Sequence, residues 1–171
     1  QQEISLQKNF LEGEKIYTIY LGGGTPSILK QEDLMKLFDV IYQNFPVATD
    51  AEITLEANPD DLYTQKIKEL KQTDINRFSI GVQSFRDADL QFMNRAHCAE
   101  EAVDSVKRVQ DAGWENITID LMYGTPTLSD EDWQQNMQTA INLNVPHISA
   151  YALTVEAVSY THLRAHETEA Y

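Results

Sequence analysis

The sequence of 171 residues contains a single cysteine, Cys98. One thiol excludes an internal disulfide and any metal site built from several thiolates. Positive charge is scarce as well, because 13 Lys and Arg residues stand against 27 Asp and Glu residues, for a net charge of −14. Nucleic acids and anionic membranes are bound largely through Lys and Arg, so we expect neither nucleic acid nor a membrane surface as a partner.

Long apolar runs are also absent. None approaches the roughly 18 residues that a membrane-spanning helix needs, so we expect no stable membrane insertion. Residues 1–11 are polar and acidic and do not resemble a signal peptide. Apolar residues still make up 42% of the chain, which is enough for a buried core. The composition therefore favours a cytoplasmic chain with one globular domain.

The apolar pattern predicts an α/β fold. Alternating segments predict strands at residues 16–21, 52–57, 77–82, 117–123 and 147–153. Helical spacing predicts helices near residues 34–42, 62–70, 102–109 and 130–143, between successive strands. Strands that alternate with helices are typical of right-handed βαβ units and a parallel sheet. We therefore expect one α/β domain.

Three of the predicted strands have one polar face, formed by Thr54 and Glu56, by Ser79, Gly81 and Gln83, and by Thr118 and Asp120. Parallel strands that are buried on both faces are nearly continuous in apolar residues, so this polarity needs an explanation. In each strand the carboxylate or amide lies toward the carboxyl end, where parallel α/β sheets bind ligands. The pattern favours a polar small-molecule site over a barrel interior that merely satisfies its own hydrogen bonds.

A glycine-rich turn, residues 21–27 (LGGGTPS), directly follows the first predicted strand. Its glycines allow the backbone to approach a ligand and to present N–H groups to a carboxylate, an amino acid or a phosphate. The turn matches neither a Walker A loop nor the dinucleotide-binding G-x-G-x-x-G pattern. By itself it is equally compatible with an ordinary tight turn.

Three charged residues are candidates for ligand contacts. Glu56 could accept two ribose hydroxyls, or it could be a structural carboxylate paired with a neighbour. Arg95 could bind a carboxylate through two hydrogen bonds, although a surface ion pair is the commoner role in an acidic protein. Asp120 has apolar neighbours on both sides, so we expect a buried, hydrogen-bonded carboxylate in either case.

Six motifs in order resemble one family. They are LGGGTPS at 21–27, EITLEANP at 52–59, NRFSIGVQSF at 76–85, NRAH at 94–97, DLMYGTP at 120–126 and PHISAYALTVE at 146–156. Together they resemble the oxygen-independent coproporphyrinogen III oxidase-like family of radical S-adenosylmethionine (SAM) proteins. Within that family, EANP and GVQSF are more similar to the haem chaperone branch than to the oxidase, in which Asp more usually follows the position of Gln83.

The resemblance implies a fold, cofactors and a site. The fold would be a partial, TIM-like (β/α) barrel with about five βα units present, and SAM and a [4Fe-4S] cluster would bind at the carboxyl ends of the strands. By position, Gly23, Gly24 and Thr25 would hold the methionine amino end of SAM, and Glu56 would bind the ribose hydroxyls. Gln83, Arg95, Asp120 and Thr154 would line the rest of the cofactor pocket.

The ends of the chain depart from the family. The family's cluster is bound by a Cys-x3-Cys-x2-Cys loop upstream of the glycine-rich turn, and this chain has no such motif. We therefore expect residues 1–156 to be a core fragment without its first strand, inactive by itself. Residues 157–171 match nothing in the family and resemble translated sequencing-adaptor sequence, so we interpret them as a non-native tail.

The resemblance leaves more than one function open. In the intact protein, the haem chaperone branch would bind haem and transfer it to acceptor proteins. The alternative is an enzyme that oxidatively decarboxylates coproporphyrinogen III to protoporphyrinogen IX, with the porphyrinogen as its substrate. A third possibility is an unrelated α/β barrel that binds a phosphate at residues 22–25.

Overall fold

The computed structural model describes residues 2–154. All five predicted strands form, and they make one parallel sheet in the order β1-β2-β3-β4-β5. The strands are β1 (Ile16–Leu21), β2 (Val47–Ala57), β3 (Arg77–Gln83), β4 (Ile117–Tyr123) and β5 (His147–Ala152). Strand order therefore follows chain order, as successive right-handed βαβ units require.

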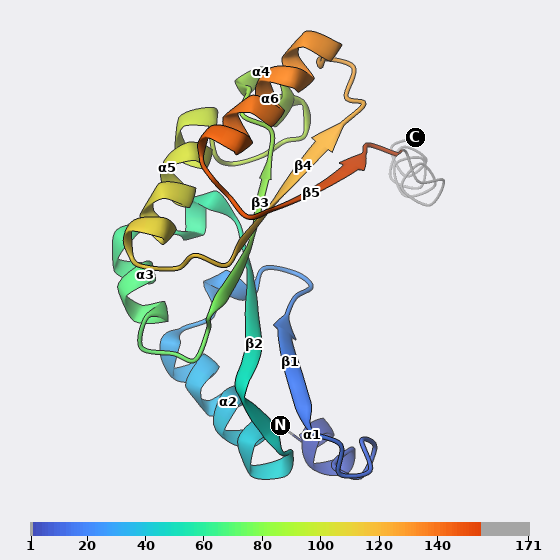
Figure 1. The fold of residues 1–171 in the computed structure, drawn as a ribbon, viewed down its shortest axis with the longest axis vertical. Coiled ribbons are helices and arrows are strands. Elements are labelled where there is room, and N and C mark those ends of the chain that lie inside the picture. The colour runs from blue at the N-terminus through green and yellow to red at the C-terminus, as the bar shows by residue number, and fades with distance from the viewer. Residues whose placement is uncertain (1, 155–171) are drawn as a thin grey trace, which may run out of the picture.

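All helices but the first lie together on one side of this twisted sheet, and the first lies near the start of β1 (Figure 1). The helices are α1 (Gln2–Leu6), α2 (Gln31–Asn44), α3 (Thr64–Leu70), α4 (Asp87–Phe92), α5 (Ala99–Asp111) and α6 (Asp130–Asn142). Two short 3-10 helices, η1 (Pro26–Ile28) and η2 (Pro59–Asp61), follow β1 and β2. The result is a partial, TIM-like (β/α) barrel, which confirms the predicted fold class.

The hydrophobic core lies between the sheet and the helices. Leu34 and Phe38 of α2 and Val106 and Val109 of α5 are buried in it. Phe78 on β3 is fully buried against sequence-distant Trp114, with the two rings edge to face and their centroids 5.0 Å apart. The apolar faces predicted for the helices near 34–42 and 102–109 therefore pack as expected.

Strand β2 begins at Val47, five residues before the predicted start at 52. Its pairing with β1 shifts between Ile16, which lies opposite Val47, and Thr18, which lies opposite Glu52. The extra residues of β2 are accommodated at this bulge, and exposed Thr49 and Asp50 lie within it. These two polar residues interrupt the alternation, so the apolar pattern could not reveal the first five residues of the strand.

The parallel register places the polar residues of neighbouring strands side by side. Glu56 lies opposite Ser79, which lies opposite Thr118. Asp120 lies opposite Ser149 on β5. These side chains share the sheet face that the helices leave uncovered, so the polar faces predicted for single strands form one continuous surface.

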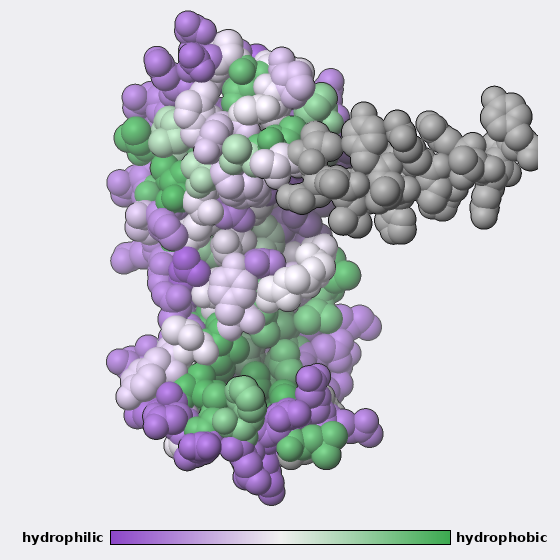
Figure 2. Space-filling view, turned by 90° about the vertical axis from the view of Figure 1, so that its right-hand side faces the viewer, coloured by the Kyte–Doolittle hydropathy of each residue, from purple (hydrophilic) through white to green (hydrophobic). Residues whose placement is uncertain are grey.

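Figure 2 faces the open side of the sheet and shows apolar surface gathering at the level of β1 and α1. Leu6, in α1, and Phe10, shortly after it, are 82% and 77% exposed. Within residues 2–154, no helix is both long enough and apolar enough to cross a lipid bilayer. The interpretation of residues 157–171 as a non-native tail concerns a segment outside the described residues.

Candidate functional site

A cavity of about 160 Å³ opens at the carboxyl ends of the strands. Its lining comprises Gly24, Thr25, Pro26, Glu56, Ala57, Asn58, Ser79, Gly81, Gln83 and Asp120. Five residues that the sequence proposed as ligand contacts are therefore brought together: Gly24, Thr25, Glu56, Gln83 and Asp120. Residues up to 96 positions apart along the chain meet here because each follows or ends a parallel strand.

The carboxylate of Glu56 is fixed between β1 and the glycine-rich turn. Tyr20 donates its hydroxyl to Oε1 over 2.8 Å, and the backbone N–H of Gly23 donates to Oε2 over 3.1 Å. Gly22 must lack a side chain here, because a Cβ would lie 2.6 Å from the Tyr20 ring and 3.0 Å from Oε1 of Glu56. Gly23 and Gly24 then turn the chain toward the cavity with φ of +80° and +67°.

Asp120 is the second carboxylate of the pocket. Burial, and after it the negative charge of Glu56, raises the pKa of Asp120 above its ordinary value, while a hydrogen bond with Ser149 acts in the opposite direction. Two carboxylates that share a partly desolvated pocket favour a ligand with positive charge. They also disfavour an anion such as a phosphate.

Gln83 closes the cavity at the end of β3. It is 8% exposed and has a φ of +67°, in the left-handed region, where the pairing of β3 with β4 shifts register. Tyr151 on β5 donates its hydroxyl to Oε1 of Gln83 over 2.7 Å. The side-chain amide is thereby oriented across the end of the sheet.

Arg95 and His97 bind the backbone of the same strand end. Nη2 of Arg95 donates to Oδ1 of Asn58 over 2.8 Å and to the carbonyl of Gly81 over 3.0 Å. The Nε2 of buried His97 donates to the carbonyl of Val82 over 3.1 Å, and burial lowers the pKa of this histidine. Arg95 makes no ion pair with a carboxylate among residues 2–154, so the predicted alternative of a surface ion pair is not seen there.

Three predicted residues, Gly23, Arg95 and Thr154, are not part of the cavity lining. Gly23 and Arg95 contact residues of the lining, as described above. Thr154 is exposed just beyond β5. Its role in cofactor binding stays a prediction.

Several residues of the site were not predicted. Tyr20 and Tyr151 lie on the same sheet face as Glu56 and Asp120, and the alternation of their strands could have identified them. Asn58 lies after the end of β2, where alternation gives no information. Its contact with Arg95 joins residues 37 positions apart and depends on the tertiary fold.

The chain does not provide the ligands of an iron–sulfur cluster. A [4Fe-4S] cluster is held by several cysteine thiolates, and Cys98 is the sole cysteine of the sequence. Cys98 is exposed at the start of α5. Among the described residues, no group of three or more His, Cys, Asp or Glu side chains is arranged to hold a metal ion.

A family model that matches most of the chain identifies the family to which it belongs. The model of the radical SAM superfamily matches residues 3–140. The chain belongs to the radical SAM superfamily. Curated relatives within this superfamily include the heme chaperones HemW of Lactococcus lactis, with 41% identity over 145 residues, and of Escherichia coli, with 39% identity over 147 residues.

This radical SAM chain spans about two fifths of those relatives, since the matches cover 85% and 86% of the chain but 38% and 39% of the two heme chaperones. Among solved structures, the coproporphyrinogen III oxidase HemN of Escherichia coli superposes with a TM-score of 0.83 and 26% identity, over 95% of this chain and 38% of that one. The archaeal Elp3 of Methanocaldococcus infernus, with a TM-score of 0.75 and 17% identity over 96% of this chain and 45% of that one, shares the fold. The predicted family and fold are thus confirmed.

Proposed function

We propose that this chain forms the SAM-binding part of a cytoplasmic haem chaperone, which binds haem and transfers it to acceptor proteins. The observation that supports SAM is the pair of carboxylates, Glu56 and Asp120, in one pocket beside a glycine-rich turn. SAM has a positively charged sulfonium and an ammonium group, and both are attracted by this charge. A phosphate would be repelled, which argues against the third possibility raised by the sequence.

The contacts of Glu56 leave it able to bind a ribose. Each of its carboxylate oxygens accepts one hydrogen bond, from Tyr20 or from Gly23, and a carboxylate oxygen has room for a second donor. We propose that the ribose hydroxyls of SAM occupy these positions, with Gly23, Gly24 and Thr25 around the methionine amino end.

The other predicted residues complete this assignment. We propose that the nitrogens of Arg95 not engaged with Asn58 and Gly81 bind the carboxylate of the ligand. Gln83, Asp120 and Thr154 would surround the rest of the SAM molecule. A [4Fe-4S] cluster would require thiolates that these 171 residues do not contain, so we assign no step of the chemistry to it here.

SAM binding is tested in the full-length protein that contains this sequence, with its cluster reconstituted, by equilibrium dialysis. We expect Glu56→Gln to weaken SAM binding about tenfold, because hydrogen bonds from hydroxyls to a charged carboxylate are lost. Glu52→Gln is the matched control. It lies on the same strand four residues earlier, its carboxylate is near Arg77 and Asn116, and it does not line the cavity.

The control should bind SAM as the wild type does. Equal affinities of wild type, Glu56→Gln and Glu52→Gln would contradict the assignment of the pocket.

Haem transfer distinguishes the chaperone from the enzyme. The full-length protein is loaded with haem and mixed with an apo-haemoprotein, and the Soret band of the acceptor is followed. We expect that band to appear, because the chain is 39–41% identical to heme chaperones. The structural likeness to HemN supports the alternative, an oxygen-independent coproporphyrinogen III oxidase.

Turnover of coproporphyrinogen III under anaerobic, reducing conditions, without haem transfer, would favour that alternative. We expect the opposite result, because the identity to HemN is lower, at 26%.

A further inference from the structure

Gln83 adopts a conformation that the chain must enforce. The φ of Gln83 is +67°, a value that residues with a Cβ rarely adopt. Strand β3 also loses its regular pairing with β4 at this residue. The hydrogen bond from Tyr151 fixes the end of the side chain. It does not fix the backbone, which must be held by the residues that follow.

The next residue, Ser84, is held from all sides. It is fully buried, and its hydroxyl donates to Oδ2 of Asp89 over 2.8 Å. The Oγ of Ser84 also accepts from Nδ2 of Asn136 over 3.0 Å and from the backbone N–H of Arg86 over 3.2 Å. Asn136, on α6, also accepts the backbone N–H of Phe85 over 2.9 Å through Oδ1.

The three central side chains are Ser84, Asp89 and Asn136, and we refer to them as the Ser84 clamp. Asp89 and Asn136 are each 1% exposed. Buried polar groups of this kind adopt one arrangement when every member is paired, because any other leaves a donor or acceptor without a partner. The clamp therefore fixes the backbone immediately after Gln83.

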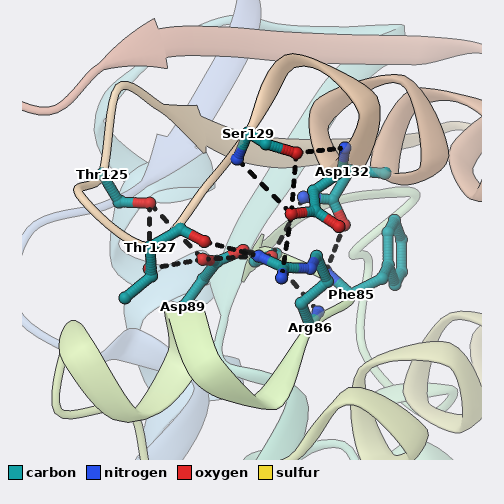
Figure 3. A network of polar contacts seen from close by, with 9 residues as sticks. Phe85, Arg86, Asp89, Thr125, Thr127, Ser129 and Asp132 are labelled. Atoms are coloured by element: carbon teal, nitrogen blue, oxygen red, sulfur yellow. Dashed lines mark hydrogen bonds and ion pairs between the residues drawn. The ribbon is translucent and has the colours of Figure 1, made fainter.

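The opposite side of Asp89 faces the segment after β4 (Figure 3). Its Oδ1 accepts from Nη1 of Arg86 over 3.0 Å and from the hydroxyl of Thr127 over 2.6 Å. Arg86 continues to Asp132 at the start of α6, with Nη2 3.0 Å from Oδ2. The side chains of this outer side bind the carboxylates of Asp89 and Asp132, and only the backbone N–H of Arg86 reaches Ser84.

We propose that Ser84 and Asn136 are positioning residues for SAM, which act on its binding through Gln83. The proposal rests on the assignment of the SAM pocket above. None of the clamp residues lines the cavity, so they would have no direct contact with the ligand. Their influence on affinity should disappear when the side chain of Gln83 is removed.

A double-mutant cycle in the full-length, cluster-reconstituted protein tests this dependence, with SAM affinity and melting temperature measured for each variant. Gln83→Ala and Ser84→Ala should each weaken SAM binding about three- to tenfold, the effect of one lost or misplaced hydrogen bond. The double variant should bind SAM no more weakly than Gln83→Ala alone. If Ser84→Ala does not fold, Asn136→Ala takes its place in the cycle.

Thr127→Val is the matched control, because it removes a hydrogen bond to the same carboxylate of Asp89 from the outer side. It should lower the melting temperature and leave SAM affinity within about twofold of the wild type. Additive effects of the Gln83 and Ser84 substitutions, or a loss of affinity in Thr127→Val as large as in Ser84→Ala, would show a general structural role and overturn the proposal.

A wild-type protein that does not bind SAM would overturn the proposed function itself, and the positioning role with it. A wild type that binds SAM and is weakened by Glu56→Gln, but not by Ser84→Ala or Asn136→Ala, would overturn the positioning role alone.

Discussion

Asp120 lies half-buried on β4, and burial together with the nearby charge of Glu56 raises the pKa of its carboxyl. The folded protein therefore holds the proton of Asp120 more tightly than the unfolded chain does. Protonated Asp120 therefore favours the folded state at low pH. This contribution to the free energy of unfolding is lost as the pH rises from the pKa in the unfolded chain, about 3.9, through the higher pKa in the folded protein. Above that folded-state pKa, the ionised carboxylate opposes folding.

Replacement of this carboxyl by an amide should remove the destabilisation caused by its ionised form. We expect Asp120→Asn to have a higher melting temperature than the wild type at pH 7, and we expect the difference to shrink as the pH is lowered toward about 4. The same variant should bind SAM more weakly, since one of the two negative charges in the pocket is lost. Thermal denaturation across this pH range and SAM dialysis at pH 7 measure the two effects.

Asp39→Asn is the control, because Asp39 is exposed on α2 and does not line the cavity. Its effect on the melting temperature should not depend on pH in the same way. A stabilisation by Asp120→Asn that is absent at pH 7, or that grows toward acid pH, would contradict the interpretation.

At the scale of helices and strands, the sequence was sufficient for the elements whose own pattern reflects burial. β1 and β4 begin and end at the predicted residues, because each has an alternating pattern bounded by polar or turn residues. α5 ends at Asp111, two residues beyond the helix predicted near 102–109. The short helix α4 was not predicted, because its six residues are too few for a periodic apolar stripe.

The candidate site was predictable where it depends on strand ends, and it was not where it depends on contacts between loops. Glu56 and Asp120 follow from alternation together with the rule that ligands bind at the carboxyl ends of parallel strands. The left-handed backbone of Gln83 could not be predicted in this way, because nothing in the neighbouring sequence distinguishes it from an ordinary strand residue. It depends on Asn136, which is 53 residues away in sequence and reaches Ser84 and Phe85 only in the folded chain.

At the scale of the whole molecule, the outer edge of β1 is open. Within residues 2–154, β1 pairs with β2 and with no other strand, and the side chains of Tyr17 and Tyr20 are 64% and 55% exposed. Unpaired N–H and C=O groups on a strand edge are a template for pairing with another chain. The net charge of −14 opposes such association, and salt screens this repulsion.

We therefore expect the 171-residue chain, expressed by itself, to self-associate, and more strongly as the salt concentration rises from about 50 mM to about 500 mM. Thr18→Lys places a charge on the exposed edge strand and should shift the chain toward the monomer, as measured by sedimentation velocity. Thr18→Val, which keeps strand propensity without a charge, should associate at least as strongly as the wild type. Equal sedimentation of the two variants would locate the association on another surface, such as the apolar region near α1, because pairing along β1 is the contact that a lysine at position 18 would oppose.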